Sequence, residues 1–256
     1  MIIVDAFTHV GECRIHDQNV TESALVEALN SNGVSAALVS PFPAPANPAK
    51  VHDQIADLGS RYPGRFFGLV NVNPHINRDL YHREVERCVR QLGFIGLVMD
   101  TLGHAMNPNG DDGRTVFEAA RDFGVPLVVE TGSVPFGLPS GLLRRARDYS
   151  DVKLVLAHSG MGMFTAEAEQ LAHEFSNVYL ETSGCPGTAV KRLVEGLGPG
   201  RVLLGSDVPE NLASELAKYR NLGLYHYQQY QSMGQNAIDL FALKGVTEVP
   251  EPVAAE

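Results

Sequence analysis

Side chains that could bind a metal ion or move a proton follow several short apolar runs in this sequence. They are His9, Glu130, His158, Glu181 and Asp207. Histidine and carboxylate side chains serve as general acids and bases, and their nitrogen and oxygen atoms are ligands of divalent cations. In a parallel barrel, the carboxyl ends of the strands meet at one rim, where the chemistry takes place. The sequence therefore predicts one site at which these side chains meet.

Glu130 is the most informative of these side chains. It ends the strongly apolar run 126–129. Burying a carboxylate there without a partner would cost on the order of 2–7 kcal/mol or more, so Glu130 needs a cation, a hydrogen-bond donor or a proton. Taken singly, His9 and His158 are more often structural residues, and Asp207 could cap the following helix. Their convergence on strand ends favours a functional site.

The elements that must position these side chains alternate along the chain. Short runs rich in Val, Ile and Leu alternate with longer amphipathic stretches, as in repeated βα units. We expect eight strands, at residues 2–5, 36–40, 66–72, 94–99, 126–130, 153–157, 178–181 and 201–204. Most of them are apolar throughout, as strands covered on both faces must be.

Helices are expected between the strands, because apolar residues recur there every three or four positions. One such stripe consists of Tyr81, Val85, Cys88, Val89 and Leu92. Asn77 can cap the start of this helix, and Gly93 can end it.

Eight strands, each followed by a helix, predict a single (β/α)8 TIM barrel over residues 1–245. An open doubly wound sheet is the alternative, although the first strand is not followed by a glycine-rich phosphate-binding sequence. Residues 246–256 have no apolar period and are predicted to form a disordered C-terminal tail.

The composition limits the partners and the location of this chain. Its 256 residues are 44% hydrophobic and carry a formal net charge of −10, which argues against nucleic acid and against an anionic membrane surface. Three distant cysteines do not suggest a disulfide framework, and the first apolar run is too short for a signal peptide. We expect a cytoplasmic protein whose partner is a small-molecule substrate.

The order of the strand-end segments resembles the amidohydrolase superfamily, in the branch that includes aminocarboxymuconate-semialdehyde decarboxylase and related small metal-dependent hydrolases. The resemblance is carried by IVDAFTHVG at 3–11, PLVVETG at 126–132, KLVLAHSG at 153–160, VYLETSG at 178–184 and RVLLGSDVP at 201–209. It covers nearly the whole predicted barrel. It also implies that a homodimer is the form to expect.

The resemblance implies a divalent metal ion held by a His-x-His pair, a histidine after the fifth strand and an aspartate after the eighth. Phe7 replaces the first histidine of the pair here, and Glu130 replaces the strand-five histidine. The family's lysine near the end of the fourth strand is also missing. The implied metal ligands are thus His9, Glu130 and Asp207, and mixed nitrogen and oxygen ligation suits Zn, Mn or Fe.

The resemblance further implies hydrolysis or decarboxylation of a small organic acid or lactone-like compound, with Asp207 and His158 as catalytic residues. Phe7, His104 and Glu181 are the predicted substrate-binding residues. His104 lies in a long polar loop that could close over the site, and an exposed loop histidine is the alternative. Because Phe7 cannot coordinate a metal, two alternatives stay open: a metal-independent lyase or isomerase, and a barrel that binds a ligand without turnover.

Overall fold

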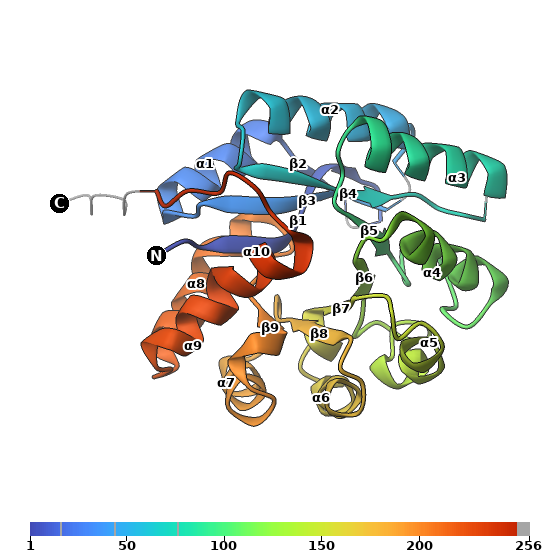
Figure 1. The fold of residues 1–256 in the computed structure, drawn as a ribbon. Helices are drawn as coiled ribbons and strands as arrows, with labels where there is room; N and C mark the ends of the chain where they lie inside the picture. Colours follow the sequence, from blue (N-terminus) through green and yellow to red (C-terminus); the bar gives the residue numbers. More distant parts are fainter. Residues whose placement is uncertain (16, 44, 76, 250–256) are drawn as a thin grey trace.

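A curled β-sheet with helices along its outer side makes up the chain (Figure 1). The computed structural model describes residues 1–15, 17–43, 45–75 and 77–249. The strands are β1 (Val4–Cys13), β2 (Gln18–Val20), β3 (Ala36–Pro41), β4 (Phe66–Asn71), β5 (Gly96–Met99), β6 (Leu127–Glu130), β7 (Leu154–Ala157), β8 (Val178–Glu181) and β9 (Val202–Leu203). Their order in the sheet is β2-β1-β3-β4-β5-β6-β7-β8-β9. β2 is antiparallel to β1, and the other neighbours pair in parallel.

The helices lie between the strands in sequence, as predicted. They are α1 (Glu22–Asn32), α2 (Pro48–Arg61), α3 (Arg78–Glu86), α4 (Asp111–Phe123), α5 (Leu143–Asp148), α6 (Thr165–Glu174), α7 (Gly187–Gly196), α8 (Leu212–Asn221), α9 (His226–Tyr230) and α10 (Asn236–Phe241). The predicted cap is confirmed, because the Asn77 side chain accepts a hydrogen bond from Leu80 N at 3.0 Å. A π-helical turn, Arg87–Gln91, continues α3 towards Gly93.

The first strand is longer than predicted, whereas the other seven predicted strands lie at their expected places. β1 continues past Asp5 to Cys13, and its last three residues pair with β2 in a hairpin. Asp5 is tolerated inside the strand because the backbone N and hydroxyl of Ser206 donate to its two carboxylate oxygens at 2.9 and 2.5 Å. A buried carboxylate is acceptable where donors satisfy it.

Two apolar layers separate the inside of the curled sheet from its outside. The inner layer includes Leu38, Leu69, Val98, Val128, Val155, Leu203 and Phe241. The outer layer, which packs against the helices, includes Val39, Leu97, Val129, Leu156 and Leu180. Because successive side chains of a strand point to opposite faces, a residue two positions after an inner residue also points inward. This places Asp100 and Glu130 inside, at the carboxyl ends of their strands.

The sheet curls far enough to bring β1 beside the segment that follows β9. Ala6 N donates to Leu204 O, and His9 N donates to Asp207 O, both at 2.9 Å. Asp207 N donates in turn to Phe7 O at 2.9 Å. These bonds hold Asp207 next to His9, although the two residues are far apart in the sequence.

The end of the chain is described only in part. Of the predicted tail, residues 250–256 lie outside the described residues, and Glu248 forms an ion pair with the amino group of Met1. None of the helices in the described part of the chain is long and apolar enough to cross a membrane.

Candidate active site

A cavity of about 170 Å³ opens at the carboxyl ends of the strands. Its polar lining consists of His9, Asp100, Glu130, Ser133, His158, Asp207 and Gln18. Phe42, Met161 and other apolar side chains complete it. A larger hollow of about 480 Å³ lies between the β1–β2 hairpin and α2, but no histidine or cysteine is among the described residues that line it. The small cavity is therefore the candidate active site, and it brings together His9, Glu130, His158 and Asp207.

His9 is buried between two carboxylates, one at each ring nitrogen. Its Nδ1 lies 3.0 Å from the backbone oxygen and 3.3 Å from Oδ1 of Asp207, and its Nε2 lies 3.6 Å from Oε1 of Glu130. Burial alone would lower the pKa of His9, but the two carboxylates outweigh burial and hold this pKa well above its usual value. The Phe42 ring is stacked on the imidazole at 4.7 Å between centroids, so Phe42 helps to fix its plane.

Glu130 lies beside a second carboxyl group, that of Asp100. Asp100 is buried directly after β5, and its Oδ1 accepts a hydrogen bond from Gly103 N at 2.5 Å. Burial and the neighbouring charge of Glu130 raise the pKa of Asp100 to about 8. Two adjacent carboxyl groups cannot both ionise cheaply unless a cation lies between or beside them. Sequence reasoning missed Asp100, although its two-residue spacing from the inward-facing Val98 could have found it.

The hydrogen-bonding pattern of His9 indicates which of its ring nitrogens carries a proton. Both acceptors near Nδ1 belong to Asp207, so the Nδ1 of a neutral His9 carries the proton and Nε2 presents a lone pair. That lone pair faces Glu130 Oε1, and both atoms are buried without a hydrogen-bond partner among the described residues. Two acceptors facing each other require a positive charge, either a proton or a metal ion. A histidine whose other nitrogen is held by an acceptor is the usual form of a metal ligand.

Asp207 occupies the Nδ1 side of His9, opposite Glu130. It adopts a left-handed backbone conformation, with φ 68°, in the segment after β9, and its side chain is 36% exposed. Non-glycine residues in this conformation are held by their surroundings and cluster at functional sites. Asp207 thus orients the His9 ring through its contacts with Nδ1, and it also lines the cavity.

His158 enters the cavity from an unusual turn after β7. His158, Ser159 and Met161 have φ values of 61°, 42° and 56°, and the glycines between and after them are also left-handed. The Nδ1 atom of His158 lies 2.9 Å from the hydroxyl of Ser183. The Phe7 ring makes edge contacts with both histidines, with centroid distances of 4.8 Å to His9 and 5.9 Å to His158.

The three predicted substrate-binding residues lie outside the lining of this cavity. Phe7 is fully buried in the inner apolar layer. Glu181 is also fully buried, and its carboxylate accepts hydrogen bonds from His158 N and Ser183. His104 is buried rather than exposed, since only 3% of its surface is accessible. Burial lowers the pKa of His104 to about 4, so it is neutral near pH 7.

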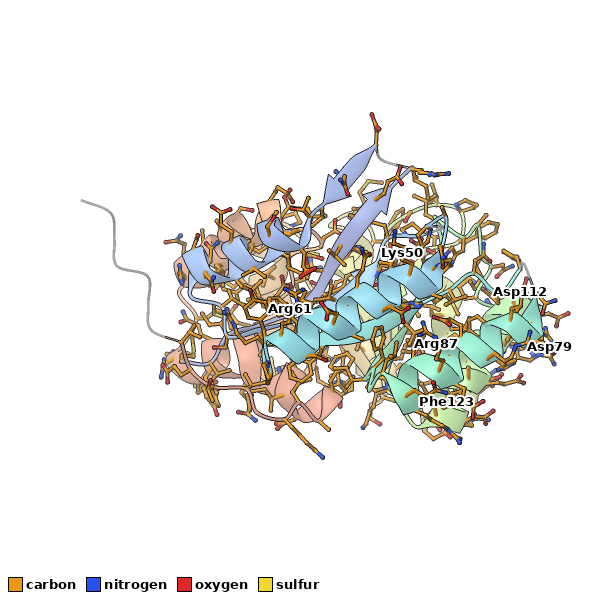
Figure 2. All side chains as sticks on the ribbon, turned by 90° about the horizontal axis from the view of Figure 1, so that it is seen from above. Lys50, Arg61, Asp79, Arg87, Asp112 and Phe123 are labelled. Carbon is orange, nitrogen blue, oxygen red and sulfur yellow. The ribbon has the colours of Figure 1, made fainter. Side chains whose placement is uncertain are left out.

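A second group of side chains, His52, Glu84 and Cys88, also has the composition of a metal site. One ligand atom from each lies within 4.8 Å of the others. Asn71 N donates to His52 Nε2 at 3.3 Å, so His52 Nδ1 carries its proton and donates to Glu84 Oε1 at 2.7 Å. The Arg87 side chain extends from the end of α3 towards α2 (Figure 2) and donates to both oxygens of Glu84. The atoms of this group are thus already paired with one another, which favours a structural role.

The fold and this site together define a class of protein. A parallel α/β sheet that delivers histidines and carboxylates to the carboxyl ends of its strands is typical of barrel enzymes. The family model for amidohydrolases matches residues 20–243, and the chain therefore belongs to the amidohydrolase family. The family resemblance seen in the sequence is confirmed.

Solved structures with a similar fold include several decarboxylases. A 5-carboxyvanillate decarboxylase from Sphingomonas paucimobilis is 19% identical with a TM-score of 0.75, over 95% of this chain and 99% of that one. A dihydroxybenzoic acid decarboxylase from Polaromonas sp. JS666, solved with manganese and 2-nitroresorcinol, is 17% identical with a TM-score of 0.74, over 94% and 97% of the two chains. A candidate 2-pyrone-4,6-dicarboxylic acid hydrolase from Pseudomonas putida is 17% identical with a TM-score of 0.72, over 95% and 98%.

Proposed function

We propose that this protein is a divalent-metal-dependent decarboxylase of a small, planar organic acid with one carboxylate. The observation that carries the proposal is a pair of buried acceptors, His9 Nε2 and Glu130 Oε1, which lie 3.6 Å apart at the cavity and have no hydrogen-bond partner among the described residues. The manganese found in similarly folded decarboxylases supports the choice of cofactor.

The residues proposed to hold the cation are His9 through Nε2, Glu130 through Oε1 and the adjacent Asp100. One nitrogen and two carboxylates form a set richer in oxygen than most zinc sites, and such a set suits Mn²⁺. Asp207, which sequence reasoning proposed as a ligand, would support the site by fixing the tautomer of His9 from behind. When bound, the cation would supply a positive charge that attracts a carboxylate and stabilises developing negative charge.

The charge of the lining supports a substrate with a single carboxylate. Three carboxyl groups, those of Asp100, Glu130 and Asp207, border the cavity, and neither lysine nor arginine is among the described residues that line it. A substrate with two carboxylates would leave one of them without a counter-charge. Phe42 and Met161 supply an apolar surface on which a flat ring could pack.

His158 is the residue proposed to move the proton. Loss of CO₂ leaves a carbanion that must take up a proton at the same carbon. His158 lines the cavity, and Ser183 engages only its Nδ1. Its Nε2 is therefore the atom proposed to take up a proton from solvent and to deliver it to that carbon, which returns His158 to its neutral form.

Hydrolysis of a neutral ester or lactone is the second candidate. It is favoured by the same contact of His158 Nδ1 with Ser183, because a lone pair on Nε2 could accept a proton from an attacking water molecule. The two reactions differ in product, because only decarboxylation releases CO₂.

The decisive experiment follows CO₂ release from mono- and dihydroxybenzoates by protein loaded with Mn²⁺. We expect turnover with a monocarboxylate, incorporation of deuterium at the former carboxyl carbon in D₂O, and at least a 100-fold loss of kcat in H158Q, given the usual contribution of a general acid. H173Q, an exposed histidine on α6, is the matched control and should retain full activity. Turnover without CO₂ would favour the hydrolase, and binding without any turnover would favour a non-catalytic barrel.

We also propose that the curled sheet is a full (β/α)8 barrel. The hydrogen bonds between β1 and the segment after β9 support closure, as does the parallel bridge between Thr8 and Asp207. A homodimer stays a prediction, and sedimentation equilibrium would test it.

A further inference from the structure

Glu181 lies behind His158 and reaches it in two ways. Its Oε2 accepts a hydrogen bond from the backbone N of His158 at 3.0 Å. The same oxygen accepts a hydrogen bond from the hydroxyl of Ser183 at 2.8 Å, and that hydroxyl lies 2.9 Å from His158 Nδ1. The other oxygen, Oε1, accepts from Ser183 N at 2.6 Å. One carboxylate thus contacts both the backbone and, through a serine, the imidazole of His158.

The hydrogen atoms of this chain of contacts can be assigned. A serine hydroxyl has a single hydrogen, and the hydroxyl of Ser183 donates it to Glu181. The hydroxyl can then only accept from His158, so His158 Nδ1 must carry a proton. Burial raises the pKa of Glu181, while the hydrogen-bond donors around its carboxylate, and His158 whenever it is protonated, oppose that rise. Two backbone N–H donors favour the ionised carboxylate that this assignment needs.

We propose that Glu181 and Ser183 are positioning residues that hold neutral His158 in the Nδ1–H tautomer and so leave its Nε2 free to exchange a proton in the cavity. This inference rests on the proposed function for the role of Nε2, but not for the tautomer. It differs from the sequence-based prediction that Glu181 binds substrate. Glu181 is fully buried, and the contacts described above engage both of its oxygens.

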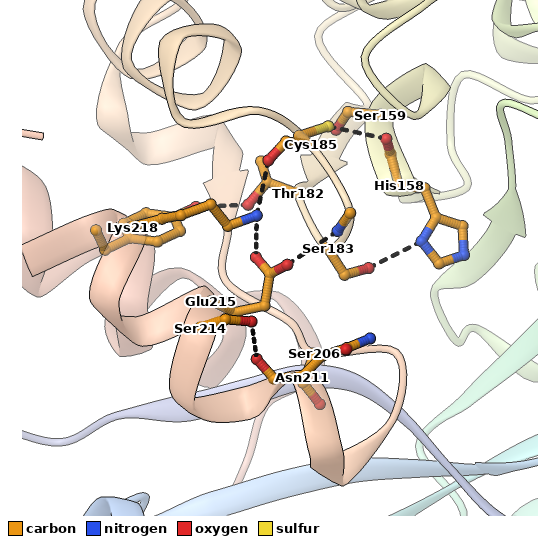
Figure 3. Close-up of polar contacts among 12 residues, drawn as sticks. His158, Ser159, Thr182, Ser183, Cys185, Ser206, Asn211, Ser214, Glu215 and Lys218 are labelled. Carbon is orange, nitrogen blue, oxygen red and sulfur yellow. Dashed lines mark hydrogen bonds and ion pairs between the residues drawn. The ribbon is translucent and has the colours of Figure 1, made fainter.

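The segment that carries Ser183 is itself held by α8. Glu215 accepts from Gly184 N at 3.1 Å, and Lys218 Nζ lies 2.5 Å from Glu215 and donates to Cys185 O at 2.7 Å (Figure 3). The Cys185 thiol donates to His158 O at 3.0 Å (Figure 3). These bonds fix the distance between Ser183 and the turn on which His158 lies.

The strained backbone of that turn is consistent with a positioning role. Left-handed conformations at His158, Ser159 and Met161 cost about 1–3 kcal/mol each and persist only where neighbouring contacts impose them. The contacts to Glu181 and Cys185 are of this kind. Gly205 makes room for this carboxylate, because a Cβ atom at that position would overlap Oε1 of Glu181.

The test is the imidazole ¹⁵N spectrum of zinc-loaded protein, in which the metal is diamagnetic. H158Q assigns the His158 signals among the 9 histidines of the chain. In the wild type, we expect the neutral form of His158 to be the Nδ1–H tautomer. In S183A, we expect the neutral form of His158 to be predominantly the Nε2–H tautomer. S183T, which keeps a hydroxyl, should restore the wild-type tautomer. S214A is the matched control, because Ser214 lies in α8 and its hydroxyl donates to Asn211 O, away from His158, and it should leave the spectrum unchanged.

Kinetics of the manganese-loaded protein then tests the consequence for the proton transfer. S183A and E181Q should lower kcat at least 10-fold with KM changed less than twofold, and S183T should recover most of kcat. An Nε2–H tautomer of His158 in the wild type would overturn the proposal, and this result does not depend on any variant. A folded S183A protein whose His158 signals match those of the wild type would also overturn it. If the Ser183 variants change the tautomer of His158 but no substrate loses CO₂, the positioning role of Ser183 and Glu181 is supported and the proposed function is wrong.

Discussion

At the scale of single residues, the chemistry of the cavity depends on which side chains face inward at the carboxyl ends of the strands. His9, Glu130, His158 and Asp207 were predicted because each follows an apolar run, and all four line one cavity. Asp100 was missed because it starts a loop of mixed polarity, in which no period is visible. Which nitrogen of His9 faces which carboxylate depends on the curl of the sheet, and no local pattern contains that information.

Asp5 provides a test of how buried acids are tolerated. Burial, together with the charge of Glu181, raises the pKa of Asp5 to about 7 against the hydrogen bonds from Ser206. The folded state therefore binds a proton that the unfolded state releases between its ordinary pKa of 3.8 and about 7. Stability from this group is fully present below that range and falls as pH rises through it, by up to about 1.4 kcal/mol per pH unit.

The variant D5N should remove this dependence, because an amide does not titrate. The unfolding free energy of the wild type minus that of D5N, from urea titrations at pH 4 to 8, should fall with rising pH and level off above pH 7. D57N, at an exposed position on α2, is the matched control for the loss of an aspartate. A difference for D5N that stays constant with pH would mean that Asp5 titrates alike in both states.

At the scale of elements, the βα repeat was predictable and the β1–β2 hairpin was not. Strand ends were placed where a polar residue follows an apolar run, and aspartate is depleted in strands. The sequence pattern therefore predicts that the first strand ends at Asp5. In the structure the strand continues past Asp5, because Ser206 donates hydrogen bonds to the buried carboxylate. The shortness of β2 also left little signal, since three residues cannot show a period. The packing of α2 against α3 likewise depends on a buried polar network among residues that are distant in sequence.

Glu84 is the centre of that network and should contribute to stability. Burial by itself would raise the pKa of Glu84, but His52 and Arg87 outweigh it and lower this pKa to about 2. Its stabilising contribution is present above the ordinary value of 4.5 and is lost as pH falls towards 2. E84Q should lower the unfolding free energy at pH 7 by about 1–3 kcal/mol, as expected when buried donors lose a charged acceptor.

The matched control for E84Q is E86Q on the same helix. Glu86 forms an ion pair with Arg90, and its side chain is 52% exposed, so its loss should cost less than about 0.5 kcal/mol. Urea unfolding at pH 7 and pH 3 compares the two variants. Equal effects of E84Q and E86Q at pH 7, or an E84Q effect that does not shrink at pH 3, would contradict the structural role of the network.

At the scale of the whole molecule, the curl of the sheet converts separate strand ends into one acidic pocket. Asp100, Glu130 and Asp207 come from β5, β6 and the segment after β9, and each would be an ordinary surface acid on an open sheet. Brought together around a cavity of about 170 Å³, they repel one another and thus destabilise the fold unless a proton or a cation is present. A bound dication should therefore stabilise the entire chain and not only its site.

Thermal unfolding with and without Mn²⁺ measures this coupling and also decides between the two candidate metal groups. At 100 times its dissociation constant, a ligand of the folded state adds about 2.7 kcal/mol, which raises the Tm of a chain of this size by roughly 5 to 10 °C. E130Q should lose this rise, because it removes the charge that faces His9 Nε2. E84Q, already less stable without metal, should keep it. The reverse result would place the metal at His52, Glu84 and Cys88, and no rise in the wild type would mean that a proton on His9 satisfies the cavity by itself.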